Sequence, residues 1–225
     1  MNIEKKIAAE HAVELVEDGM IVGLGTGSTA TYMIHALAER VTNGLSITGV
    51  PSSQRTADLA KQCGIPLTTL DEAVILDINI DGADEFDSKL QMIKGGGGAL
   101  LREKIIAYNS KQNVIITDSS KQVEKLGKFK LPIEVIPFSK NGILRKLEKM
   151  GLQPALRVKN EVPFETDENN VIIDVDAFGF DDLHELNHTL LAMPGVVETG
   201  LFLDLADYII MGKDESITIF EKNKS

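Results

Sequence analysis

The sequence has a single cysteine, Cys63, no tryptophan and only 5% aromatic residues. One cysteine excludes an internal disulfide and a cysteine cluster for a metal, and such sparse use is typical of a reducing compartment. Apolar residues make up 43% of the chain, but no run of them approaches the length of a membrane span. We therefore expect a cytoplasmic protein with no membrane partner.

Basic residues are also in the minority, since 23 Lys and Arg against 34 Asp and Glu give a formal net charge of −11. Such a chain repels the phosphates of nucleic acid and anionic lipid, so we expect neither as a partner. Segment 1–19 interleaves apolar and charged residues, which predicts an amphipathic helix and not a signal peptide. A phosphorylated substrate would have to be bound by a few local lysines and N–H groups.

Short Val- and Ile-rich runs alternate with helical patterns in the first half of the chain. We expect strands at 20–24, 45–50, 73–80 and 113–118, and helices at 29–40, 53–63 and 99–108. This alternation predicts an α/β fold, a Rossmann-like open parallel sheet with helices on both faces.

The pattern changes in the second half. Strands are expected at 131–138, 153–158, 171–178 and 196–203, and helices at 139–150 and 181–191. That order is the βαββαβ arrangement of a ferredoxin-like α+β domain. We expect the last strands, 206–212 and 216–222, to return to the first sheet. The predicted domains are therefore an α/β catalytic domain of 1–128 and 204–225, and an inserted ferredoxin-like domain of 129–203.

A glycine-rich turn, Gly25-Thr26-Gly27-Ser28-Thr29, lies between the first predicted strand and the helix after it. Glycines let the backbone turn tightly and let an anion approach. The new helix supplies free N–H groups and the positive end of its dipole. The turn therefore predicts a phosphate site, the alternative being a plain tight connection.

Two nucleotide-binding patterns compete for the same turn. The Walker A pattern requires a lysine before the Ser/Thr, and this turn has none. The dinucleotide pattern G-x-G-x-x-A does match Gly25 to Ala30, but no acidic residue lies between Glu39 and Asp58 to hold a ribose. The NAD interpretation is therefore disfavoured.

Three carboxylates fall within five residues in Asp81-Gly82-Ala83-Asp84-Glu85, directly after a predicted strand. Ligands of open parallel sheets bind at the carboxyl ends of the strands. The segment therefore predicts part of an active site. A solvated acidic turn or an Mg²⁺ or Ca²⁺ site are the alternatives, although the rest of a calcium loop is missing.

Four consecutive glycines follow Lys94, and Glu103 lies about one turn into the next predicted helix. A cation, a row of N–H donors and a carboxylate are the groups needed to abstract a proton next to a carbonyl. A flexible linker is the alternative, and the ordered apolar flanks argue against it. Spacing alone leaves open whether Asp81, Asp84 or Glu103 is the base.

His184-Glu185-Leu186-Asn187-His188 matches the H-E-x-x-H pattern of zinc hydrolases. We expect Leu183, Leu186 and Leu190 to face the sheet and the two histidines to lie at the side. Short motifs of this kind match by accident, so we expect no zinc here.

Taken together, the motifs GTGST at 25–29, DGADE at 81–85 and KGGGGALLREK at 94–104 resemble ribose-5-phosphate isomerase of the A type. Two further segments fit that family, DSSK at 118–121 and MPGVVETGLF at 193–202. The resemblance runs from Lys5 to the last strands.

The resemblance implies reversible conversion of D-ribose 5-phosphate to D-ribulose 5-phosphate through a cis-enediolate, in the pentose phosphate pathway. It implies no metal, no cofactor, and a homodimer or homotetramer. It implies that Glu103 is the proton acceptor. It also implies that Asp81 and Asp84 transfer the protons of the sugar hydroxyls and take part in ring opening. Lys94 would lie near the reacting oxygens. The substrate-binding residues that it implies are Thr26, Gly27, Ser28, Thr29, Asp81, Gly82, Ala83, Asp84, Lys94, Gly95, Gly96, Gly97, Lys121 and Lys5.

Two other functions stay open beside the isomerase. One is an enzyme for amino-sugar phosphates or acyl-CoA on a related fold, although 225 residues are few for a CoA transferase of two full halves. The other is a non-catalytic sugar-phosphate sensor. A sensor is expected to carry a DNA-binding segment, and none precedes residue 20.

Overall fold

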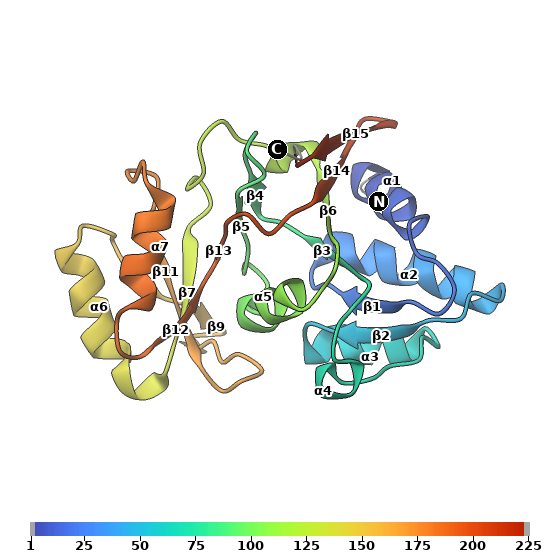
Figure 1. Ribbon diagram of the computed structural model, residues 1–225. Coiled ribbons are helices and arrows are strands. Elements are labelled where there is room, and N and C mark those ends of the chain that lie inside the picture. The colour runs from blue at the N-terminus through green and yellow to red at the C-terminus, as the bar shows by residue number, and fades with distance from the viewer. Residues whose placement is uncertain (1–2, 223–225) are drawn as a thin grey trace. The chain divides into compact units, whose positions relative to one another are not determined.

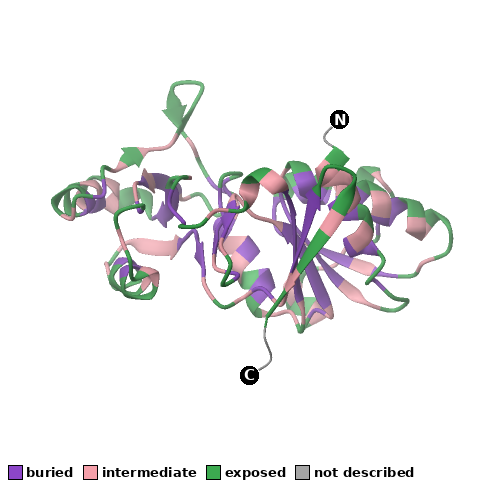
Figure 2. Ribbon diagram, turned by 90° about the horizontal axis from the view of Figure 1, so that it is seen from above, coloured by how far each residue is buried: buried purple, intermediate pink, exposed green. Residues whose placement is uncertain are grey.

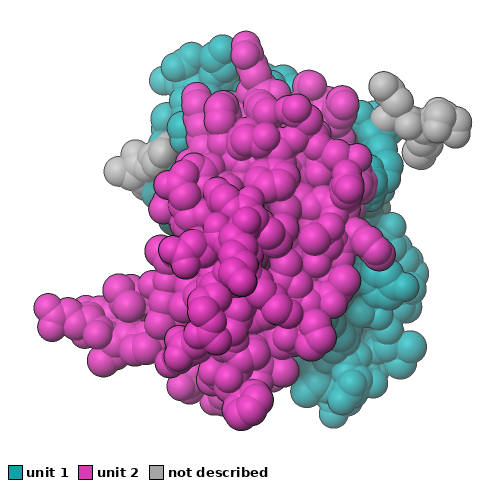
Figure 3. All heavy atoms as spheres, turned by 90° about the vertical axis from the view of Figure 1, so that its left-hand side faces the viewer, with its two compact units in different colours: residues 1–83, 102–122, 204–225 teal, residues 84–101, 123–203 magenta. Residues whose placement is uncertain are grey.

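The computed structural model describes residues 3–222. The chain forms two compact units (Figure 3). Unit 1 comprises Met1–Ala83, Arg102–Gln122 and Asp204–Ser225, and unit 2 comprises Asp84–Leu101 and Val123–Leu203. Compared with the predicted domains, unit 2 also takes in 84–101 and 123–128; the predicted boundaries at 128/129 and 203/204 stay predictions.

Unit 1 is built on a six-stranded sheet in the order β15-β14-β6-β3-β1-β2 (Figure 1). All neighbouring pairs are parallel except β14 with β15. The strands are β1 (Ile21–Leu24), β2 (Thr48–Pro51), β3 (Ile78–Gly82), β6 (Asn113–Asp118), β14 (Tyr208–Lys213) and β15 (Ser216–Glu221). The last two strands return to the first sheet, as predicted.

Helices cover both faces of this sheet. Successive side chains of each strand point to opposite faces, so apolar side chains on both faces are buried under helices. Val22 and Leu24 point into a core shared with α1 and α2, whereas an added Cβ on Gly23 would meet Ile106 of α5 on the other face. The helices are α1 (Ile3–Val13), α2 (Ser28–Thr42), α3 (Gln54–Gln62), α4 (Leu70–Ala73), α5 (Leu100–Tyr108) and the 3₁₀ turn η1 (Ser119–Lys121). Among residues 3–222, no helix has the length and apolar character that crossing a membrane requires.

The predicted strand at 73–80 begins only at Ile78. Of its first part, only Ala73 belongs to α4, where the Thr69 hydroxyl accepts the Glu72 N–H and the Glu72 carboxylate accepts the Thr69 N–H. Residues 74–77 form bends, with one isolated bridge between Leu76 and Ser110. This capping box satisfies N–H groups that a helix start leaves exposed, so the short helix takes the first residue of the expected strand.

Unit 2 contains a four-stranded antiparallel sheet in the order β12-β7-β11-β8. Its elements are β7 (Leu131–Val135), the 3₁₀ turn η2 (Pro137–Ser139), α6 (Lys140–Lys149), β8 (Ala155–Leu156), β11 (Val171–Val175), α7 (Leu183–Leu191) and β12 (Val196–Thr199). Their order is the βαββαβ pattern that the sequence predicts. An exposed hairpin, β9 (Val158–Lys159) with β10 (Val162–Pro163), is inserted between β8 and β11 (Figure 2).

A small sheet of unit 2 is not predicted by the sequence, although one of its strands lies within the expected strand 196–203. It joins β4 (Glu85–Phe86), β5 (Met92–Ile93) and β13 (Leu201–Phe202). The expected strand at 196–203 is divided between β12 and β13 at Gly200, whose N–H donates to Pro132 O at 2.7 Å. The consequence is that β5 and β13 fix the chain just before the glycine run at 95–98.

A buried carboxylate of unit 2 gives a testable pH effect on stability. Glu134 in β7 is 1% exposed, and its Oε1 accepts hydrogen bonds from Thr166 Oγ1 at 2.9 Å and Asn170 Nδ2 at 3.0 Å. Its Oε2 accepts none from the residues that the structure describes. Burial, which outweighs these hydrogen bonds, raises the pKa of Glu134 above its ordinary value of 4.5.

Because that pKa is higher in the folded protein, ionising Glu134 costs more there than in the unfolded chain. Stability therefore falls as the pH rises from about 4.5 through the raised pKa. We expect Glu134→Gln to gain stability relative to wild type between about pH 4 and pH 7, measured by urea unfolding at each pH. Any loss of stability caused by the buried amide itself is independent of pH, so it does not affect how the difference between variant and wild type changes with pH. If the difference in unfolding free energy between variant and wild type stays constant across this pH range, the pKa of Glu134 is the same in the folded and unfolded states.

Candidate active site

The glycine-rich turn of unit 1 connects β1 to α2. Gly27 directly precedes the helix and has φ 119°, a left-handed conformation that favours glycine. Ser28 begins the helix and is exposed, and the first turn carries no acidic residue. The first N–H groups of a helix lack intrahelical acceptors, so this end of α2 can donate to an anion.

Buried hydroxyl groups hold the turn in place. Thr26 Oγ1 lies 2.7 Å from Ser52 Oγ, 2.8 Å from Ser53 Oγ and 3.0 Å from Thr56 Oγ1. Thr56 Oγ1 in turn donates to Gly25 O at 3.0 Å. Sequence reasoning missed these partners; the one signal was a Ser-Ser pair at the carboxyl end of β2. The Thr26 hydroxyl therefore supports the turn from within.

Asp81 is fixed against the same turn. It lies in β3, beside β1, and is 1% exposed. Its Oδ1 accepts hydrogen bonds from Thr26 N at 3.0 Å and Gly82 N at 2.7 Å. An added Cβ on Gly25 would lie 2.2 Å from that oxygen. The structure therefore brings Asp81 and the turn together, as expected for the carboxyl ends of neighbouring parallel strands.

Lys5 is the cation that the structure places beside the turn. Its Nζ donates to Ser28 Oγ at 2.9 Å and lies 3.7 Å from Asp118 Oδ2. Lys121 follows at the end of η1, and Asp118 Oδ1 caps this turn by accepting from Ser120 N at 3.0 Å. The segments that carry both lysines are thus ordered by contacts within unit 1.

Glu103 lies in the first turn of α5 and is 3% exposed. The helix reaches the sheet closely because Gly23 has no side chain: a Cβ there would be 2.7 Å from Ile106 Cγ2. At 3% exposure the Glu103 carboxylate is shielded from bulk water, and a positioned carboxylate can act as a general acid or base.

Lys94 of unit 2 is held at the end of β5. Its N–H donates to Gly200 O at 2.9 Å, and its Nζ lies 5.2 Å from the centre of the Phe202 ring. The residue is 3% exposed. An added Cβ on Gly200 would approach Lys94 O to 2.3 Å, so glycine is required for this close packing.

The glycine run after Lys94 is tied down on both sides. The Gly96 N–H donates to Asp84 Oδ2 at 2.7 Å, so in this structure one of the predicted N–H donors is engaged by a predicted site carboxylate. Arg157 donates through Nη1 to Gly95 O at 2.8 Å and through Nε to Asp174 Oδ2 at 2.9 Å. Arg157 belongs to no motif, and sequence reasoning missed it. The run is an ordered loop and not a flexible linker.

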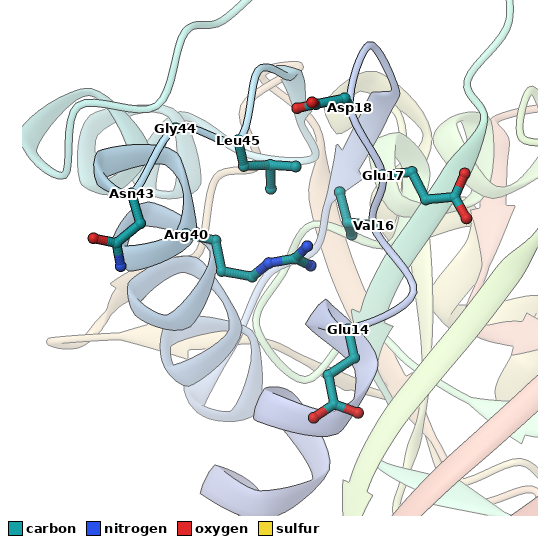
Figure 4. A pocket seen from close by; sticks show the side chains of 8 residues that line it. All are labelled: Glu14, Val16, Glu17, Asp18, Arg40, Asn43, Gly44 and Leu45. Atoms are coloured by element: carbon teal, nitrogen blue, oxygen red, sulfur yellow. The ribbon is translucent and has the colours of Figure 1, made fainter.

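A pocket of about 500 Å³ lies at the other end of α2 from the glycine-rich turn. Figure 4 shows Arg40 extending toward the loop that carries Glu14, Glu17 and Asp18. The Arg40 Nη1 donates to Val13 O, the last residue of α1. None of the predicted site residues lines this pocket, and its three carboxylates disfavour a phosphate.

The H-E-x-x-H segment lies on α7 as predicted, with Leu186 and Leu190 buried and His184 and His188 exposed. Within residues 3–222, no three side chains of His, Cys, Asp or Glu are grouped to hold a metal ion. The segment is an amphipathic helix whose leucines pack on the unit 2 core.

Comparison with known proteins assigns this chain to a family. Residues 48–216 match the family model for ribose 5-phosphate isomerase A (phosphoriboisomerase A). The ribose-5-phosphate isomerase A of Ruegeria sp. is 52% identical over 216 residues, covering 92% of this chain and 82% of its own. The ribose-5-phosphate isomerase A of Levilactobacillus brevis is 50% identical over 216 residues, covering 95% of this chain and 95% of its own.

Solved structures agree over nearly the whole chain. Ribose 5-phosphate isomerase A of Methanocaldococcus jannaschii has a TM-score of 0.92 and 42% identity, covering 97% of this chain and 98% of its own. A D-ribose-5-phosphate isomerase in complex with phospho-erythronic acid also has a TM-score of 0.92, with 41% identity, covering 96% of this chain and 97% of its own. The chain therefore belongs to the ribose 5-phosphate isomerase A family.

Proposed function

We propose that this chain catalyses the reversible isomerisation of D-ribose 5-phosphate to D-ribulose 5-phosphate. Its family membership, with a likeness to isomerase structures that extends over nearly the whole chain, carries this proposal. The buried carboxylates and the helix N-terminus of unit 1 supply the chemistry that the reaction needs.

We assign the phosphate of the substrate to the start of α2. The N–H groups of Gly27, Ser28 and Thr29 and the hydroxyl of Ser28 are suited to donate to its oxygens. Lys5, 2.9 Å from Ser28 Oγ, supplies positive charge, and Lys121 is assigned as a second contact. Thr26 shapes the turn through its buried hydroxyl cluster. Gly82 and Ala83 continue the chain from Asp81 and are assigned to the sugar.

We assign the proton transfer between carbons to Glu103. After the ring opens, Glu103 removes the proton from C2 and leaves a cis-enediolate, and it then returns that proton to C1. A hydroxyl proton passes from O2 to O1 in the same conversion, so the atoms balance. Asp81 and Asp84 are assigned to the hydroxyl protons and to ring opening.

Negative charge develops on the oxygens of the enediolate and needs fixed donors. We assign this role to Lys94, with the backbone of Gly95, Gly96 and Gly97 lining the sugar. Lys94 is held by its backbone bond to Gly200 and by the Phe202 ring, so its ammonium is already ordered. Such preorganisation is what stabilises a transition state more than a ground state.

The remaining features of the proposal concern the setting of the enzyme. It needs no metal or cofactor, because the base and the donors are protein groups. We propose a cytoplasmic homodimer or homotetramer acting in the pentose phosphate pathway. Large exposed apolar side chains such as Phe138, which is 99% exposed, support self-association.

Incubation of the purified chain with ribose 5-phosphate, with and without EDTA, tests this function. We expect ribulose 5-phosphate to form at the same rate in both arms, followed by its ketose absorbance. Absence of turnover would overturn the isomerase and favour a sugar-phosphate sensor, or an amino-sugar-phosphate enzyme if such a substrate reacts. Loss of turnover with EDTA would overturn metal independence.

A further inference from the structure

Glu4, in the first turn of α1, accepts three hydrogen bonds through its two carboxylate oxygens. Oε2 accepts from Ser119 N at 3.0 Å and from Ser119 Oγ at 2.8 Å, and Oε1 accepts from Asp214 N at 3.0 Å. Ser119 begins η1 after β6, and Asp214 lies in the turn between β14 and β15. One side chain therefore joins the start of α1 to two loops of the sheet. Figure 1 shows α1 beside β14 and β15.

The backbone at Glu4 is seated equally closely. A Cβ added to Gly212 of β14 would lie 2.0 Å from Glu4 O and 2.8 Å from Glu4 Cα. Only glycine at position 212 lets the first turn of α1 approach the strand this far. The backbone contact fixes the helix on the sheet, and the carboxylate fixes its direction at the two loops.

Both segments anchored by Glu4 carry a lysine assigned to the substrate. Lys5 is the next residue, and its Nζ lies 2.9 Å from Ser28 Oγ at the phosphate turn. Lys121 ends the 3₁₀ turn that starts at Ser119. Long cationic side chains lose freedom when they bind a phosphate, and a rigid attachment reduces what is lost.

We propose that Glu4 is a positioning residue for phosphate binding, which holds the segments of Lys5 and Lys121 in place at the start of α2. This inference rests on the proposed assignment of that turn to the substrate phosphate. Backbone hydrogen bonds from Ser119 and Asp214 lower the pKa of Glu4 below its ordinary value of 4.5, so the anchor stays ionised at neutral pH.

The charge of Glu4 and its positioning role predict opposite effects on phosphate binding, so the direction of the change tests the inference. Glu4 is an anion near a site for an anion, so its removal by itself would tighten phosphate binding. Positioning predicts the opposite. We expect Glu4→Ala to raise KM for ribose 5-phosphate and the dissociation constant of inorganic phosphate together, by about 3- to 30-fold, with kcat within about twofold.

Two milder variants, Glu4→Gln and Ser119→Ala, should show the same effect at a smaller size. The glutamine keeps one accepting oxygen, and the alanine at 119 keeps the backbone donor, so both should give smaller increases in the same direction. Both variants also protect the test against poor folding of Glu4→Ala. Glu10→Ala is the matched control, since Glu10 lies on the same helix and pairs with Lys6 at 3.5 Å on the surface. It should leave both constants unchanged.

Kinetics and calorimetric titration with inorganic phosphate separate the possible failures. Unchanged or tighter phosphate binding in folded Glu4→Ala would overturn the positioning role, whatever the wild-type activity. A fall in kcat without a change in KM would overturn it as well. Wild type and Glu10→Ala that bind phosphate but do not turn over ribose 5-phosphate would overturn the proposed function alone, and weaker phosphate binding in Glu4→Ala would then still support the anchor.

Discussion

We expect Glu103→Gln to lower kcat by about 10²- to 10⁴-fold or more and to change KM little. Glutamine has nearly the same shape as glutamate, but its amide cannot take the proton from C2. The side chain is 3% exposed, so bulk water is poorly placed to replace the lost base. Steady-state kinetics with ribose 5-phosphate measures the effect, and equal unfolding midpoints of variant and wild type assign it to chemistry.

Glu134→Gln is the matched control for that experiment. It makes the same substitution at another buried glutamate, which is 1% exposed and has no assigned part in the reaction. Its kcat should equal that of wild type. A near-normal kcat in Glu103→Gln would remove Glu103 from the role of base, and the same substitution logic would then move to Asp81→Asn and Asp84→Asn.

Strand positions follow from the sequence where burial is complete. Residues 113–118 form β6 with the predicted bounds, because a strand buried along its whole length has a continuous apolar centre. The strand expected at 73–80 was wrong in its first part. There Ala73 ends the short helix α4, and Val74 and Ile75 lie exposed before β3, so burial does not support their β-propensity.

Some features of the candidate site follow from local sequence motifs, and others depend on contacts between residues far apart along the chain. The positions of Asp81 and the glycine-rich turn follow from neighbouring strands of a parallel sheet, so motifs were sufficient to predict them. The hydroxyls around Thr26 and the Arg157 contact with Gly95 join residues far apart along the chain. Single serines or arginines carry no periodic signal, and only the fold reveals what they touch.

Gly25→Ala should disrupt the turn and Asp81 at once. The added Cβ would lie 2.2 Å from Asp81 Oδ1 and 2.5 Å from Asp81 Cα. Because one of these atoms belongs to the backbone, rotation of a side chain cannot relieve the overlap. We expect a loss of about 1–3 kcal/mol in the free energy of unfolding, typical of overpacking. A shift of about 1 Å at Asp81 should also lower kcat/KM about 100-fold.

Gly82→Ala is the control for the stability measurement, since it lies one residue from Asp81. Its Cβ would come no closer than 3.8 Å to Ile116 O, which is ordinary contact. Urea unfolding should therefore separate the two alanine variants, with the lower midpoint for Gly25→Ala. Equal midpoints, together with a normal kcat/KM in Gly25→Ala, would mean that the turn and Asp81 can move apart without loss. The contact between Asp81 and Thr26 N at 3.0 Å would then have no part in holding the site.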